Sequence, residues 1–223
     1  MHGRRGLYRV FRDKPGGEAT MDESFSSEQR PAAQTVIAVV GRLAPEKGQD
    51  LFLRALAGAR VLPREVFLIG GMSPGDETYL AELEVHATAL DLPVTFTERV
   101  EDLEPYLRHA DILVQCSLRP EPFRRVVWEA MRAGCAVIAT RPAGTEQLIE
   151  PGRNGLLVDP GSRPQLTRAL DTLITDQELR GKYADAARVR AAEFEITASA
   201  RATPAFAATL SETRWRAAGG TYA

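Results

Sequence analysis

The segment that decides the fold runs from Arg119 to Thr140 and reads RPEPFRRVVWEAMRAGCAVIAT. It predicts a turn, a helix and a strand, in that order. Pro120 and Pro122 oppose a helix at the start of the segment, while Gly134 suits a helix C-terminus because glycine adopts positive φ without steric cost. The apolar run at residues 135–139 has the length of a buried strand. One short helix therefore lies between a proline-rich turn and a strand.

The predicted helix has one apolar face, and Glu129 falls at its margin beside Arg125 and Arg132. Two interpretations of this carboxylate stay open: it faces a ligand-binding cleft, or it only pairs with a neighbouring arginine at helical spacing. Glu121 in the preceding turn either contacts a ligand or is a solvated loop charge. The apolar face consists of Val126, Val127, Ala130, Met131 and Ala133.

On both sides of this segment, short apolar runs alternate with stretches of helical spacing. Parallel neighbours need a crossover connection, so six such runs separated by helices predict an α/β fold with a doubly wound parallel sheet. The predicted strands are residues 35–40, 66–69, 94–97, 112–116, 136–140 and 155–158. The predicted helices outside the deciding segment are residues 49–59, 77–90, a pair within 164–193 that meets near 175–177, and 196–210 with Pro204 interrupting it.

Composition predicts one globular domain with a tail at each end. The 223 residues are 44% hydrophobic and 26% charged, which suffices for one core of ordinary size. Residues 1–33 are rich in glycine, proline and charge without a sustained period and predict a flexible lead-in. Residues 34–195 predict the Rossmann-like domain, and residues 196–223 a C-terminal helix and tail.

Charge and patterning argue against several classes of partner and location. A formal net charge of −2 gives no long-range attraction for a polyanion, so nucleic acid is not an expected partner. The sequence has neither an apolar run of about 18 residues nor a signal-peptide pattern, which predicts no transmembrane segment and a cytoplasmic location. Cys116 and Cys135 are expected to be small core residues, and His2, His86 and His109 show no metal or triad spacing.

The loops that leave the predicted strands carry most of the polar chemistry, because ligands gather at the carboxyl ends of the strands in an open α/β sheet. In the first loop, Gly41 and Gly48 bracket Arg42 and Lys47 just before a predicted helix. Two cations beside a helix N-terminus suit a phosphate or diphosphate, although the spacing is not that of a P-loop. The alternative is a capped helix with solvated charges. The two adjacent glycines, Gly70 and Gly71, indicate a tight turn or a close approach of the backbone to a ligand.

Several motifs in this order resemble the C-terminal, donor-binding half of a retaining nucleotide-sugar glycosyltransferase of family four, which has the GT-B fold. The resemblance covers residues 35–188. It rests on GRLAPEKG at 41–48, LIGG at 68–71, ADILVQCS at 110–117, the EPF and EAM motifs that contain Glu121 and Glu129, VIAT at 137–140 and EPGRNGLLV at 150–158.

This resemblance implies a nucleoside diphosphate sugar as donor substrate and assigns roles by position. Arg42 and Lys47, next to Gly41, would bind the diphosphate and stabilise the charge that gathers on the leaving group. Glu121 would meet the hydroxyls of the transferred sugar, and Glu129 would accept hydrogen bonds from the ribose. Glu121, Arg42 and Lys47 are therefore the expected catalytic residues. The remaining expected donor contacts are Phe123, the backbone of Arg124, Arg125 and Val126 beside the diphosphate or sugar, and Arg99 and Val100 beside the base.

The resemblance implies neither a metal nor another cofactor, and the sequence has no D-x-D motif. Arg124 and Ala143 stand where the family usually has glycine, and Arg124 either crowds the donor or adds a diphosphate contact. Family members also carry an N-terminal acceptor-binding domain, which residues 1–33 do not predict. The chain is then a fragment, acts with a separate acceptor-binding domain or chain, or is a catalytically inactive nucleotide-sugar-binding subunit. A GT-B isomerase acting on the nucleotide sugar is a further alternative.

Overall fold

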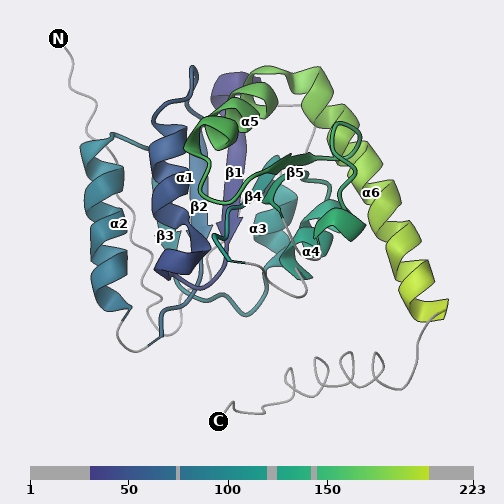
Figure 1. The fold of residues 1–223 in the computed structure, drawn as a ribbon, viewed down its shortest axis with the longest axis horizontal. Coiled ribbons are helices and arrows are strands. Elements are labelled where there is room, and N and C mark those ends of the chain that lie inside the picture. Colours follow the sequence, from purple (N-terminus) through teal and green to yellow (C-terminus); the bar gives the residue numbers. More distant parts are fainter. Residues whose placement is uncertain (1–30, 74–75, 120–124, 142–144, 201–223) are drawn as a thin grey trace.

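The computed structural model describes residues 31–73, 76–119, 125–141 and 145–200, with side chains to residue 195 (Figure 1). The strands are β1 (Val36–Val40), β2 (Glu65–Ile69), β3 (Val94–Thr97), β4 (Ile112–Gln115), β5 (Ala136–Thr140) and β6 (Leu156–Val158). The α-helices are α1 (Gln49–Leu56), α2 (Glu77–Ala89), α3 (Glu104–His109), α4 (Arg125–Ala133), α5 (Arg163–Thr175) and α6 (Gln177–Ala200). Three short 3-10 helices complete this part: η1 (Ala32–Gln34), η2 (Pro45–Lys47) and η3 (Thr145–Gln147).

The six strands form one sheet in the order β3-β2-β1-β4-β5-β6, and every neighbouring pair is parallel. The prediction of a doubly wound parallel α/β sheet is therefore confirmed. After β1 the chain builds β2 and β3 on one side and then returns past β1 to build β4, β5 and β6 on the other. The strand order reverses between β1 and β4, and such a switch point opens a crevice at the carboxyl ends of the two strands.

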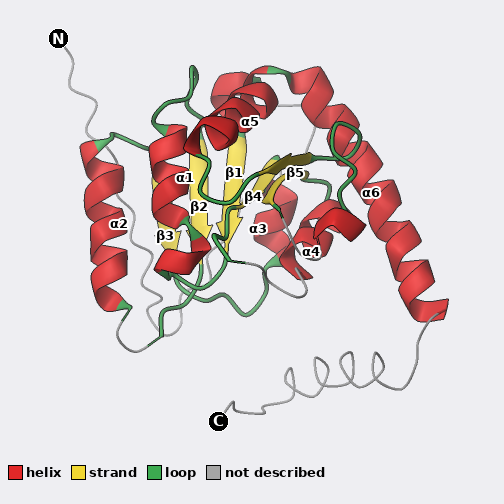
Figure 2. Ribbon diagram, in the orientation of Figure 1, coloured by secondary structure: helices red, strands yellow, loops and turns green. Residues whose placement is uncertain are grey.

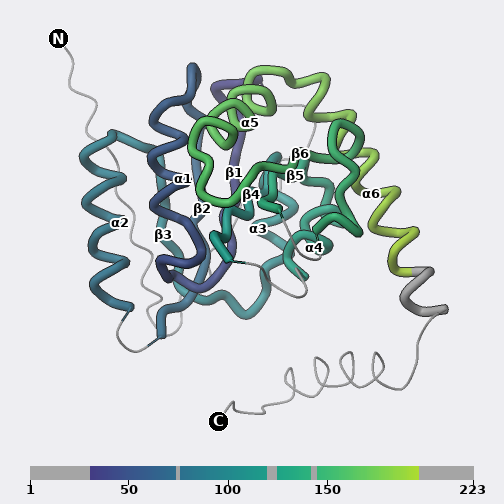
Figure 3. The backbone as a smooth tube through the Cα atoms, viewed as in Figure 1, coloured from purple at the N-terminus to yellow at the C-terminus, as the bar shows by residue number. Residues whose placement is uncertain are grey.

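Helices cover both faces of the sheet (Figure 2). Ile37 and Val39 of β1 belong to one buried cluster, which receives side chains of α1, α2 and α5. Val36 and Ala38 of the same strand point the other way, into a second cluster with α3, α4 and α6. This alternation is the period-two pattern of a strand buried on both faces. Figure 3 shows α1 and α2 side by side on one side of the sheet, and α6 alongside α4 on the other.

The helix in the deciding segment forms where the sequence predicts it. α4 covers Arg125–Ala133, and Gly134 follows it with φ of +92°. Its fully buried side chains, Val127, Ala130 and Met131, belong to the predicted apolar face. The other two members of that face, Val126 and Ala133, are partly buried and pack against the same cluster.

The helix predicted to begin at residue 196 is wrong for the part that the structure describes. α6 runs unbroken from Gln177 to Ala200, because neither glycine nor proline interrupts residues 190–200 and alanine and glutamate there favour a helix. The helix predicted at residues 49–59 is shorter than expected, since α1 ends at Leu56 and the chain then turns near Gly58.

The two cysteines are buried free thiols, as predicted for core residues. Burial raises the pKa of the Cys135 thiol to about 12. His109 lies at the end of α3, and its ring packs edge-on against Phe67 with the ring centroids 6.1 Å apart. Among the described helices, none has the length and apolar character needed to cross a membrane.

Candidate functional site

The loop after β1 is held against the ends of two other strands. The amide of Gly41 donates to the Ile69 carbonyl at 3.0 Å, and that of Leu43 donates to the Gly71 carbonyl at 2.9 Å. The loop therefore continues beside the end of β2 before it turns into η2. A Cβ on Gly70 would collide with the Gly41 carbonyl oxygen. The sequence predicted a tight turn or a close approach to a ligand at Gly70, and the close approach that the structure shows is to the backbone of Gly41.

The second half of this loop lies against the end of β4. Gly48 has φ of +74°, and a Cβ there would collide with the Cys116 carbonyl oxygen. The Cys116 Sγ lies 3.4 Å from the Lys47 carbonyl oxygen and 3.3 Å from that of Gly48. The Leu118 amide donates to the Glu46 carbonyl at 2.8 Å. These contacts fix η2, and with it Lys47, to the segment that leaves β4.

Gln49 begins α1 and holds the loop from inside. It is 1% exposed, and its Nε2 donates to the Arg42 carbonyl at 2.8 Å. The Tyr79 hydroxyl of α2 lies 3.3 Å from Gln49 Oε1, and the Asp50 amide donates to that same hydroxyl at 3.2 Å. Burial raises the pKa of Tyr79, so its hydroxyl keeps its proton. The predicted phosphate site at this helix N-terminus therefore has one first-turn amide, that of Asp50, already engaged by Tyr79.

A cavity of about 120 Å³ lies at the switch point between the ends of β1 and β4. It brings together Gly41 and Lys47 of the predicted first loop with Val126 of the deciding segment. Lys47, Gln49, Gln115 and Ser117 are the polar residues of its lining. The lining residues are Val39, Val40, Gly41, Lys47, Gln49, Val114, Gln115, Cys116, Ser117 and Val126.

A second cavity, of about 430 Å³, lies beside the first at the carboxyl ends of β1 and β2 and the loop after β3. The two cavities share Val40 and Gly41. The second one brings together the predicted residues Arg42, Arg99 and Val100. Its full lining is Val40, Gly41, Arg42, Ile69, Gly70, Gly71, Met72, Ser73, Arg99, Val100 and Leu103.

Arg42 is engaged by two carboxylates at this edge. Its Nη1 donates to Asp76 Oδ2 at 2.8 Å, and its Nη2 pairs with Glu46. Asp76 also accepts a hydrogen bond from the Ser73 amide at 3.2 Å, just before α2 begins. The Arg42 side chain is 42% exposed, so these pairs lie in water and are individually weak. An anion of higher charge can therefore displace these carboxylates from the guanidinium with a small loss of free energy.

The carboxylate predicted to bind ribose pairs instead with an arginine of its own helix. Arg125 Nε lies 2.6 Å from Glu129 Oε1, which is the pairing that the alternative interpretation expected. Neither residue lines the two cavities. The Glu129 side chain is 25% exposed, and its contact with a donor stays a prediction. Glu121, Phe123 and Arg124 lie outside the residues that the structure describes.

Sequence reasoning missed a group of buried polar side chains at the same edge. Gln115, Ser117, Thr140 and Thr145 follow or end β4 and β5, and each is at most 6% exposed. Gln115 and Ser117 line the smaller cavity. The available indication was that polar residues end two otherwise apolar strands, in LVQCS and VIAT.

The family model of glycosyl transferases group 1 matches residues 20–190. The chain belongs to this family. The D-inositol 3-phosphate glycosyltransferase of Corynebacterium jeikeium is 34% identical over 203 residues, which cover 86% of this chain and 48% of the relative. The lipopolysaccharide core biosynthesis glycosyltransferase LpsE of Rhizobium meliloti is 30% identical over 159 residues, or 70% of this chain and 44% of the relative. The chain thus spans about half the length of the curated relatives it matches.

Solved structures of similar sequence have the same fold. HepE of Anabaena in complex with UDP-glucose superposes with a TM-score of 0.69 at 31% identity, over 80% of this chain and 49% of HepE. The C-terminal domain of the group 1 protein LpcC from Francisella tularensis superposes with a TM-score of 0.65 at 30% identity, over 71% of this chain and 85% of that domain. The Rossmann-like sheet of this chain is therefore an architecture that its family shares.

Proposed function

We propose that this chain is the donor-binding part of a glycosyltransferase of family four, which moves a sugar from a nucleoside diphosphate to an acceptor with retention of configuration. The observation that carries the proposal is the cavity at the β1/β4 switch point, where Lys47 meets the polar ends of α1 and β4. HepE, whose fold this chain shares, was solved in complex with UDP-glucose. The match to most of the LpcC C-terminal domain supports the assignment to that half of the enzyme.

In this proposal the two cations of the first loop stabilise the leaving group. A departing nucleoside diphosphate gathers negative charge, and cations fixed in advance lower the energy of the transition state. Lys47 lines the smaller cavity, and its backbone is fixed by the contacts of η2 with Cys116 and Leu118. Arg42 lines the larger one and exchanges its carboxylate partners for the diphosphate. This role requires no metal and no further cofactor.

The remaining groups of the donor take the other positions of the same edge. The base lies in the larger cavity beside Arg99 and Val100, and the diphosphate lies between the two cavities, near Gly41. Glu129 turns from Arg125 to the ribose, and the backbone of residues 124–126 faces the diphosphate. Glu121 holds the sugar hydroxyls, and the acceptor enters from a separate domain or chain.

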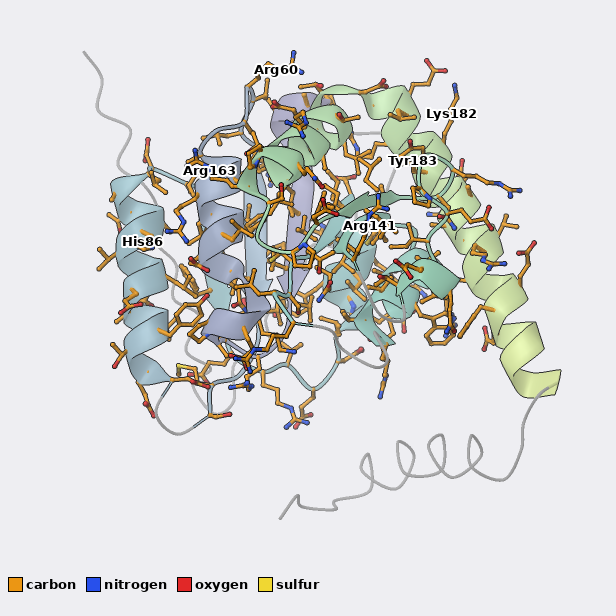
Figure 4. The ribbon with its side chains drawn as sticks, in the orientation of Figure 1. Arg60, His86, Arg141, Arg163, Lys182 and Tyr183 are labelled. Atoms are coloured by element: carbon orange, nitrogen blue, oxygen red, sulfur yellow. The ribbon has the colours of Figure 1, made fainter. Side chains whose placement is uncertain are left out.

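Calorimetric titration of the chain with UDP, GDP and ADP tests the donor site. We expect one nucleotide to bind and Lys47→Ala to weaken it by about ten-fold or more, since hydrogen bonds to charged groups contribute about 1.5–3 kcal/mol. Glu129→Ala should also weaken nucleotide binding, because it removes the proposed contact with the ribose hydroxyls. Lys182→Ala is the matched control, because Lys182 lies on α6, away from the carboxyl ends of β1 and β2 (Figure 4). Equal affinity of the Lys47 and Lys182 variants would contradict the proposed role of Lys47.

A nucleotide-sugar-binding subunit without transferase activity would have the same site, so binding alone does not separate the two proposals. Incubation with the sugar donor of the preferred nucleotide, with and without candidate acceptors, separates them. The transferase proposal expects a glycosylated acceptor whose anomeric configuration matches that of the donor. An inverted product would contradict retention, and sugar transfer of either kind would exclude the inactive subunit.

A further inference from the structure

We propose that Thr140 is a positioning residue that fixes Lys47 for the diphosphate through Ser117. This inference rests on the proposed donor site. Thr140 ends β5 and is 1% exposed. Its hydroxyl donates to the Ser117 carbonyl at 2.9 Å, with Gln115 Oε1 farther away at 3.4 Å. The Thr140 carbonyl in turn accepts from the Thr145 hydroxyl at 3.2 Å.

The Thr140 hydroxyl connects β5 to β4 where their backbone pairing has ended. The register of the two strands runs as far as the pair Gln115 and Ala139. Thr140 itself pairs with Val158 of β6. Its side-chain bond therefore joins the end of β5 to the segment that follows β4, two residues beyond the last paired residue, Gln115.

Burial makes this bond a strict constraint on geometry. Ser117 is 2% exposed, and its Oγ accepts from Gln115 Nε2 at 2.6 Å. A buried polar group that loses its partner is destabilised by more than the bond itself contributes, so the arrangement resists displacement. The Ser117 backbone is thus held by β5 from one side, while its hydroxyl is held by β4.

The constraint reaches Lys47 through the neighbours of Ser117. On one side, Cys116 Sγ contacts the carbonyls of Lys47 and Gly48. On the other side, the Leu118 amide donates to the Glu46 carbonyl at 2.8 Å. Both contacts fall on η2 or directly after it. Ser117 and Lys47 also line the same small cavity, so a shift of Ser117 changes the position of Lys47 relative to the opposite wall.

The test compares Thr140→Val, which removes the hydroxyl at nearly constant volume, with Thr140→Ser, which keeps it. The probe is the nucleotide that the wild-type chain binds, titrated calorimetrically. We expect about five-fold weaker binding for Thr140→Val, the size of one lost hydrogen bond, and near wild-type binding for Thr140→Ser. If the valine variant does not fold, Thr140→Ala removes the same bond and carries the same expectation.

Thr35→Val is the matched control for a general loss of stability. Thr35 is also fully buried, and its hydroxyl also donates to a backbone carbonyl, that of Pro31 at 3.4 Å, but it lies at the amino end of the sheet. The midpoint temperature of thermal unfolding should be lower for both valine variants than for the wild type. Only Thr140→Val should weaken nucleotide binding, and an equal loss of affinity in Thr35→Val would contradict a positioning role.

A double-mutant cycle shows whether the effect passes through Lys47. In a Lys47→Ala background, Thr140→Val should weaken binding by less than two-fold, because the group that it positions is gone. The same five-fold loss in both backgrounds would overturn the inference. If wild-type chain binds none of the three nucleotides, the proposed donor site fails and this role with it. If it binds and Thr140→Val binds equally well, only the positioning role fails.

Discussion

The two cavities at the carboxyl edge adjoin each other but are built in different ways. The smaller one has Lys47 fixed by η2 and walls of buried polar side chains that bond to one another. The larger one is lined by the backbone of Gly70 and by Arg42, whose ion pairs are exposed to water. The difference shows which part of such a site is prearranged. A diphosphate needs charge at fixed positions, whereas a base can be selected by side chains that vary without disturbing the core.

The largest expected effect comes from the close backbone approach of Gly70 to Gly41, the glycine that lines both cavities. In Gly70→Ala, the new Cβ collides with the Gly41 carbonyl and pushes the β1 loop away from β2. We expect the free energy of unfolding to fall by about 2 kcal/mol, as in other overpacked sites, and nucleotide affinity to fall by about ten-fold or more. Chemical denaturation and calorimetry measure the two quantities.

Gly58→Ala is the control for this change. A Cβ there would have ordinary contacts, with its nearest neighbour, the Ala55 carbonyl, at 3.4 Å. Its stability and affinity should stay near those of the wild type. A stable Gly70→Ala variant with normal binding would show that the β1 loop relaxes and that the two cavities are less rigidly joined than the structure indicates.

An intermediate effect is expected from the larger cavity. Arg99 lines it without lining the smaller one. Arg99→Ala should change the ratio of affinities among UDP, GDP and ADP by about three- to ten-fold, since it removes one polar contact to the base. Lys47→Ala should instead lower all measurable affinities by a common factor. Parallel titrations of both variants test whether the two cavities have separate roles. If Arg99→Ala lowers the affinities for all three nucleotides by the same factor, the larger cavity does not select the base.

The smallest effect concerns the carboxylates around Arg42. Asp76→Asn removes the charge that pairs with Arg42 but keeps an oxygen for the Ser73 amide. The free energy of unfolding should change by less than about 1 kcal/mol, because exposed ion pairs contribute little. Nucleotide affinity should rise by about two-fold, since the guanidinium then has only the Glu46 carboxylate to exchange for the diphosphate. A fall in affinity would show that Asp76 holds Arg42 in its productive position.

The sequence predicted the fold well because its signals are local. Each strand is a short apolar run, and Gly134 directly follows the end of α4. The failures are local as well. α1 ends three residues earlier than predicted because glycine at position 58 disfavours a further turn of helix, and α6 continues past residue 196 because no helix-breaking residue stands there.

The site was predicted only where charge or glycine marks it. Lys47 and Arg42 are conspicuous beside two glycines, and the strand-end rule placed them correctly at the edge of the sheet. Gln49, Tyr79 and Thr140 were missed because their partners lie in other elements, and no local period shows which polar side chain will meet which carbonyl. The pairing of Glu129 with Arg125 is a local contact at helical spacing, and it is one of the two interpretations that the sequence left open.

The reversal of strand order between β1 and β4 has a consequence for how the chain acquires its site. Cys116 and Gly48, which meet behind the smaller cavity, are 68 positions apart in the chain. The entropy of closing that long loop must be overcome before either wall exists, so the cavity belongs to the slow, non-local part of folding. The proposed nucleotide would bind only chains that have completed this closure, and its binding free energy would then stabilise the closed state by mass action. In the proposed function, the donor therefore also stabilises the fold at a contact between segments far apart in the sequence.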